Sequence, residues 1–225
     1  MQGAGGLGMS SRTAVRVSSS QMLKGEGVKE KKKKIMQKKI KQVIEESVSV
    51  KQAILQDKLL LAAIQQAVEA SISAFQADKK LLFCGNGGSA ADAQHLAAEF
   101  SGRFYLDRKP LFAEALHVNT SYLTSVANDY GFDEIYSRMV ISKGRKGDIL
   151  FGLSTSGNSP NILRAFEQAR QQGVMTIGMT GQTGGQLKEL CDILINIPSL
   201  DTPRIQEAHI TVGHIICELT EAALF

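Results

Sequence analysis

The chain has 225 residues, of which 43% are hydrophobic, and this is enough to bury one full core. Its formal net charge of +4 comes from the first 41 residues, which hold eleven Lys and Arg against two Glu, so the rest of the chain is net acidic and gives no reason to expect nucleic-acid binding. Three cysteines without CxxC spacing indicate a reducing compartment, expected to be the cytoplasm, and no apolar run is long enough to span a membrane.

The N-terminal part of the chain divides at about residue 40. Residues 1–39 are rich in Gly, Ser and Lys and predict a disordered or tag-like extension, although an Arg- and Ser-rich start is also compatible with a transit peptide. The lysine run from Lys29 to Lys41 contains no aromatic residue, so it predicts a solvated helix face rather than a nucleic-acid patch. In residues 40–77, apolar residues recur at steps of three and four, which predicts two helices with a break near Asp57. This apolar stripe needs a partner surface, either the chain's own sheet, another subunit, or both.

Residues 78–225 alternate between strand and helix patterns. The apolar run Leu81-Leu82-Phe83-Cys84 predicts a buried strand, and the run Gly85-Asn86-Gly87-Gly88-Ser89 predicts a tight loop with Ser89 as the N-cap of the next helix. Further strands are expected at 111–118, 148–153, 174–179 and 192–197, and helices at 121–128, 133–143, 160–172, 186–190 and 203–225. The alternation predicts a doubly wound α/β domain, with a parallel sheet covered by helices on both faces and ligands beyond the carboxyl ends of its strands.

Two loops at those strand ends have the composition of anion-binding sites. The glycines at 85–88 let the backbone approach a ligand closely, and on the following helix His95 and Glu99 are four residues apart, which places a metal ligand and a carboxylate on one face. The second loop, Ser154-Thr155-Ser156-Gly157-Asn158-Ser159-Pro160, sets hydroxyl groups before a helix that has Ser159 as N-cap and Pro160 as first residue. It predicts a phosphate monoester site rather than a nucleotide loop, because neither GxxxxGK[ST] nor GxGxxG occurs there.

These two loops, the His95 and Glu99 pair, and the run Arg204-Ile205-Gln206-Glu207-Ala208-His209 followed by His214 resemble the sugar-isomerase (SIS) domain family. Within it they are similar to the bacterial phosphoheptose isomerases, over residues 40–225. The resemblance implies a single SIS domain in a cytoplasmic homotetramer, with active sites at subunit contacts and one zinc ion per subunit. It further implies an aldose–ketose isomerisation of D-sedoheptulose 7-phosphate to D-glycero-D-manno-heptose 7-phosphate, the first step toward the heptose of lipopolysaccharide.

The same resemblance implies the roles of individual residues. Glu99 would be the catalytic base and His214 the acid. The zinc ligands would be His95, Glu99, Gln206 and His214. The substrate would be held by Asn86, Gly87, Gly88, Glu99, Asn128, Asp129, Ser154, Thr155, Ser156, Ser159 and Gln206. The chemistry agrees with these residue types, because moving a carbonyl between adjacent carbons needs a base, an acid and stabilisation of an enediolate, which a Lewis-acidic metal supplies.

Four points about this site stay open from the sequence. A carboxylate bound to zinc is a poorer base, so the two roles of Glu99 conflict if they are simultaneous. Gln206 and His214 are eight residues apart, about 12 Å along a straight helix, so either Gln206 lies in a distorted first turn or different subunits supply the ligands. His209 is the competing ligand, but it is expected to be a core or interface residue, and His117 likewise. Pro203 stands where some relatives carry Asp.

Two other functions are compatible with the same fold. One is a non-catalytic SIS-fold regulator that binds the replication initiator protein, and the other is an SIS isomerase acting on a different sugar phosphate, such as a hexosamine. A binding module has no need of a base and an acid, so the presence of Glu99 and His214 favours the enzyme.

Overall fold

The computed structural model describes residues 19–225, with side chains from residue 28 onward. The chain divides into two compact units, residues 1–45 and 46–225. The elements of the described residues follow in the order α1 Ser19–Gln56, α2 Lys58–Gln76, β1 Leu81–Gly85, α3 Gly88–Ser101, β2 Ala113–Ala115, α4 Thr120–Tyr130, the 3-10 turn η1 Phe132–Glu134, α5 Ile135–Lys143, β3 Ile149–Ser154, α6 Pro160–Gln171, β4 Met175–Thr180, the 3-10 turn η2 Gln186–Glu189, β5 Ile193–Asn196 and α7 Thr202–Leu224.

The first unit is described from residue 19 and consists of the N-terminal part of α1. Residues 19–39 are therefore helical where a disordered or tag-like extension was expected, and the expectations for residues 1–18 lie outside the described part of the chain. The lysines from Lys29 to Lys41 are exposed along this helix, which confirms the solvated face. Among residues 19–225, none of the helices combines the length and the apolar character that crossing a membrane requires.

The break between the two N-terminal helices lies at Asp57, as predicted. The Asp57 carboxylate accepts hydrogen bonds from the backbone N–H groups of Leu59 and Leu60, each at 3.0 Å, and so caps α2. Leu60 and other apolar residues of α2 are buried, whereas Leu59 is exposed. The apolar stripe thus packs partly against the domain's own core and leaves a part uncovered.

The sheet has five strands in the order β2-β1-β3-β4-β5, and every neighbouring pair is parallel. This confirms the doubly wound α/β fold. The direction of winding reverses between β1 and β3. The helices that follow these two neighbouring strands lie on opposite faces of the sheet. The carboxyl ends of these two strands are Gly85 and Ser154, so the two polar loops of the sequence lie side by side at the point where such folds bind ligands.

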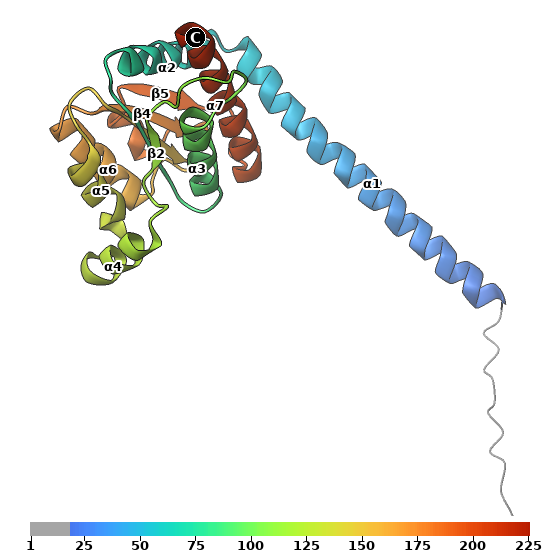
Figure 1. Cartoon of the computed structure of the whole chain (residues 1–225). Coiled ribbons are helices and arrows are strands. Elements are labelled where there is room, and N and C mark those ends of the chain that lie inside the picture. The colour runs from blue at the N-terminus through green and yellow to red at the C-terminus, as the bar shows by residue number, and fades with distance from the viewer. Residues whose placement is uncertain (1–18) are drawn as a thin grey trace, which may run out of the picture. The chain divides into compact units, whose positions relative to one another are not determined.

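Side chains of successive strand residues enter two different cores. Phe83 and Phe151, whose rings are 4.9 Å apart, belong to the core formed with α2, α3 and α7. Leu82 and Leu150 belong to the core formed with α4, α5 and α6. Figure 1 shows α3 and α7 on one side of the sheet and α5 and α6 on the other. Strands buried on both faces account for the continuous apolar runs in the sequence.

Three local predictions differ from the structure. The expected N-cap at Ser89 is wrong, because Gly87 adopts a φ of +55° and turns the chain into the helix earlier, so that α3 begins at Gly88. The strand expected at 111–118 pairs only over Ala113–Ala115, at the edge of the sheet. The helix expected at 186–190 is the short 3-10 turn η2.

Candidate functional site

The loop after β1 is held by its own glycines and by neighbouring side chains. The Tyr136 hydroxyl of α5 donates a hydrogen bond to the carbonyl of Gly85, the last residue of the strand. At Gly88, a Cβ atom would lie only 2.6 Å from Nε2 of Gln206, so any larger residue would displace the Gln206 amide from its place beside the loop. Because Gly87 and Gly88 are exposed, the backbone of this loop faces solvent and is accessible to a ligand.

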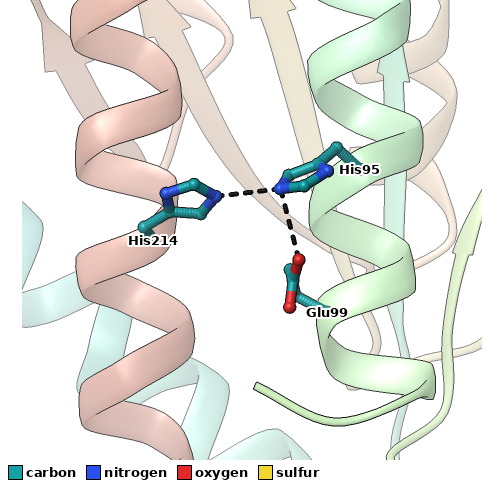
Figure 2. A group of neighbouring side chains, drawn as sticks. All are labelled: His95, Glu99 and His214. Carbon is teal, nitrogen blue, oxygen red and sulfur yellow. Dashed lines mark hydrogen bonds and ion pairs between the residues drawn. The ribbon is translucent and has the colours of Figure 1, made fainter. Parts of the chain in front are cut away.

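Figure 2 shows His95 and Glu99 on α3 turned toward His214 on the facing helix α7. The Nε2 atoms of His95 and His214 are 3.0 Å apart, and His95 Nε2 is 3.2 Å from Glu99 Oε1. One ligand atom of each of the three side chains lies within 4.8 Å of the others. The sequence placed the first two on one helix face, and the fold brings the third to them.

Two further side chains, of Asp92 and Phe104, lie beside this cluster. Asp92 lies one turn before His95 on α3, and its Oδ2 atom is buried without a hydrogen-bond partner. Burial raises the pKa of Asp92 above its ordinary value, and the neighbouring His95 and His214 lower it by less. The ring of Phe104 packs against His214 with 5.6 Å between ring centres. No sequence pattern identified Asp92, although its spacing of three residues from His95 places it near the same face of the helix.

The cluster fits a zinc ion by the chemistry of its donors. Two imidazole nitrogens and one carboxylate oxygen are a donor set that zinc accepts, and catalytic zinc sites use three protein ligands with an open fourth position. The side chains of His95, Glu99 and His214 already converge without large movement. The buried Oδ2 of Asp92 has no hydrogen-bond partner and lies near enough to His95 and His214 for their charges to lower its pKa, so it offers a further oxygen beside the cluster.

The loop after β3 gathers hydroxyl groups at the N-terminus of α6. Ser159 is the N-cap and Pro160 the first helical residue, as predicted, but the Ser159 side chain does not cap the helix. Its Oγ instead lies 3.1 Å from Oγ of Ser154, and the Ser156 hydroxyl accepts a hydrogen bond from the Asn158 N–H at 3.2 Å. The first N–H groups of α6 therefore lack a side-chain cap from Ser159 and can serve an anion.

A cavity of about 240 Å³ opens beside this loop. It is lined by Thr155, Ser156, Asn158, Gly181, Gln182, Thr183, Ser199, Leu200, Thr202 and Ile205. Its lining is mostly hydroxyl, amide and backbone groups without a charged side chain, a character that suits a hydroxylated, phosphorylated ligand rather than an apolar one.

The structure does not bring all predicted site residues together within one chain. Helix α7 is continuous, so Gln206 and His214 are about 12 Å apart along its axis, and Gln206 lies at Gly88. Asn128 and Asp129 are exposed on α4, where the Asn128 amide donates to the Asp129 carboxylate at 2.9 Å. Within residues 28–225, no hydrogen bond joins these two to the other predicted residues. Their roles stay predictions.

Of the remaining two histidines, His209 is a core residue and His117 is half-buried. His209 is fully buried, and its Nε2 lies 3.1 Å from the carbonyl of Thr180 at the end of β4. Burial lowers the pKa of His209 to about 4, against the opposing effect of this hydrogen bond. Burial likewise lowers the pKa of His117. The expectation that His209 is a core residue is confirmed. The three cysteines are unpaired.

A buried ion pair ties together the two helices that carry the cluster. The Glu221 carboxylate of α7 accepts hydrogen bonds from the N–H groups of Phe104, Tyr105 and Leu106 at 2.7 to 3.0 Å and from Arg108 Nε at 2.8 Å. Arg108 in turn donates to the carbonyl of Glu99 at 3.0 Å and to that of Phe100 at 2.8 Å, in the last turn of α3. The ion pair fixes residues 104–108, and this segment places Phe104 against His214. No sequence pattern identified the ion pair.

Comparison with known proteins agrees with this geometry. The model of the SIS domain family matches residues 39–181. The phosphoheptose isomerase of Aneurinibacillus thermoaerophilus is 50% identical over 186 residues, covering 83% of this chain and 94% of that protein. That of Clostridium acetobutylicum is 53% identical over 182 residues, covering 81% and 93%.

Solved structures give the same result. The structure of phosphoheptose isomerase GmhA from Neisseria gonorrhoeae superposes with a TM-score of 0.78 at 41% identity, covering 83% of this chain and 99% of that one. A phosphoheptose isomerase from Francisella tularensis superposes with a TM-score of 0.79 at 35% identity, covering 83% and 98%. The chain therefore belongs to the SIS domain family and, within it, to the phosphoheptose isomerases, which are isomerase enzymes.

Proposed function

We propose that the protein converts D-sedoheptulose 7-phosphate to D-glycero-D-manno-heptose 7-phosphate in the cytoplasm, the first step toward the heptose of lipopolysaccharide. The observation that carries the proposal is the approach of Glu99 and His214 from facing helices, which gives the site a carboxylate and an imidazole within 4.8 Å of each other. The names of the relatives, phosphoheptose isomerases, support this choice of substrate.

In this proposal the base and the acid act on adjacent atoms of the sugar. Glu99 removes the proton from the carbon beside the carbonyl, and the electron pair forms the enediolate between C1 and C2. Glu99 then returns a proton to the other carbon, while His214 moves a proton between the two oxygens. Proton transfer by such groups contributes typically a factor of 10² to 10⁴ in rate.

Zinc belongs to this proposal as one ion per subunit. His95, Glu99 and His214 would hold it, and Gln206, about 12 Å from His214 along the continuous helix α7, would be a fourth ligand only from another subunit. Glu99 and His214 would leave the ion when they act on protons, because a metal-bound carboxylate or imidazole is a poorer base. When bound, the ion would polarise the substrate carbonyl and stabilise the negative oxygens as a Lewis acid.

The two loops would hold the rest of the substrate. The phosphate would lie at the loop after β3, supported by its hydroxyl groups and the N-terminus of α6, and the sugar at the loop after β1. The proposed contacts are Asn86, Gly87, Gly88, Ser154, Thr155, Ser156, Ser159 and Gln206, with Asn128 and Asp129. We propose a homotetramer as the working assembly, and the exposed apolar residues Ile44, Val48, Leu55 and Leu59 support a contact between subunits.

The experiment is to follow the Glu99→Gln variant by NMR with sedoheptulose 7-phosphate in D₂O. The wild type is expected to form the aldose and to incorporate solvent deuterium at the carbon that receives the proton. The variant should lose at least 100-fold in rate with its fold intact. Glu218→Gln, an exposed substitution on α7, is the control and should retain full activity. Near wild-type turnover by Glu99→Gln would remove Glu99 as the base.

A further inference from the structure

Asn161 is a buried amide at the beginning of α6 that no pattern in the sequence singled out. It is the second helical residue after the N-cap Ser159, and its exposure is only 1%. A primary amide carries two N–H donors and one carbonyl acceptor, and leaving these unpaired in the interior is costly. A partner for Asn161 is therefore needed inside the domain.

That partner is Asn86, in the loop after β1. Asn86 Nδ2 donates to Asn161 Oδ1 at 2.9 Å, and Asn161 Nδ2 donates back to Asn86 Oδ1 at 2.9 Å. The reciprocal pair requires complementary orientations of the two amides. After pairing, the amide of Asn86 still has one N–H and one acceptor position. Asn86 is half-buried beside the exposed Gly87, so these remaining groups lie at the accessible side of the loop.

The pair also joins the two loops that the proposed function assigns to the substrate. The residues are 75 positions apart in sequence, one beyond β1 and the other beyond β3, on the two sides of the point where the sheet winding reverses. The backbone of the first loop is held separately, by the bond from Tyr136 to the carbonyl of Gly85. The backbone and the Asn86 side chain are thus fixed by two different partners.

We propose that Asn161 is a positioning residue, which holds the amide of Asn86 in the orientation that binds the hydroxyl and carbonyl oxygens of the sugar phosphate. This inference rests on the proposed function. Asn161 does not touch the substrate, and its effect passes through Asn86. A free asparagine side chain loses rotational entropy when it binds a ligand. Because the pair already fixes the Asn86 side chain in the folded protein, most of that entropy cost does not arise on substrate binding.

The test is a double-mutant cycle on kcat/KM for sedoheptulose 7-phosphate. Asn86→Ala and Asn161→Ala are each expected to lower kcat/KM about 10-fold, and the double variant should be no worse than either. Zinc affinity, measured by competition with a chromophoric chelator, should stay unchanged in all three. Asn161→Asp replaces Asn161→Ala if the alanine variant does not fold. Its side chain has nearly the same volume but cannot donate back to Asn86, so a similar loss in kcat/KM is expected.

Gln168→Ala is the matched control, because it removes an amide from the same helix α6 that pairs with Gln172, away from both loops. It should keep kcat/KM within threefold of the wild type. Losses that multiply to about 100-fold in the double variant, a parallel loss of zinc affinity, or an equal loss in Gln168→Ala would each overturn the positioning role. Absence of activity in the wild type would instead overturn the proposed function.

Discussion

The ion pair between Glu221 and Arg108 allows a stability prediction from its geometry. In the Glu221→Gln variant the carboxylate becomes an amide of nearly the same shape. One oxygen of Glu221 accepts from Phe104 N–H and Arg108 Nε, and the other accepts from Tyr105 and Leu106 N–H. Whichever way the new amide turns, its NH₂ group faces two N–H donors. The substitution thus leaves a buried guanidinium without its counter-charge and loses two hydrogen bonds.

Breaking a buried ion pair by removing one partner costs about 3–5 kcal/mol. Glu221 is 2% exposed, so water cannot replace the lost interaction. The expected result is a fall of that size in the free energy of unfolding, which moves the urea midpoint by at least about 1 M. The measurement is urea unfolding of zinc-free protein followed by circular dichroism, with the exposed Glu218→Gln as the control. A loss below about 1 kcal/mol would refute the reasoning.

Three further predictions concern the site and its supports. Ser156→Ala should raise KM for sedoheptulose 7-phosphate in steady-state assays, because a phosphate hydrogen bond is lost, and an unchanged KM would exclude Ser156 from the site. Gly88→Ala should displace the Gln206 amide and lower kcat about 10-fold while the free energy of unfolding changes by less than about 1 kcal/mol; full activity would contradict this packing. The pKa of His209 is about 4 in the folded state and about 6.5 in the unfolded state, so between these values only the unfolded state takes up a proton. The free energy of unfolding should therefore be unaffected by His209 above pH 6.5 and lower by about 2 kcal/mol at pH 5. His209→Gln should remove that part of the pH dependence in urea unfolding, and an unchanged profile would contradict it.

Local chain chemistry was sufficient to predict most of the fold. The break at Asp57, the apolar strands and the alternation of strand with helix follow from capping and periodicity, which depend on neighbouring residues. The start of α3 was predicted two residues late, because the φ of Gly87 depends on the loop around it and not on the capping preference of Ser89. The strand near 113–115 was predicted too long because only pairing with β1 defines its ends.

The candidate site was predictable where it depends on spacing along one helix. His95 and Glu99 are one turn apart and meet as expected. The approach of His214 depends on the packing of α7 against α3, and it entered the prediction through the family resemblance rather than through periodicity. The Asn86 and Asn161 pair joins residues from different loops, and nothing in either local sequence indicates that the two amides meet. Contacts of this kind depend on the assembled sheet.

The most direct test of the account is conversion of sedoheptulose 7-phosphate, followed by NMR, with the protein as purified, after chelation, and after zinc is restored. The account predicts formation of the heptose phosphate, loss of activity on chelation and its recovery with zinc. Unchanged activity after chelation would contradict the zinc site at His95, Glu99 and His214. No conversion in any state would contradict the isomerase assignment and favour a sugar-phosphate-binding regulator.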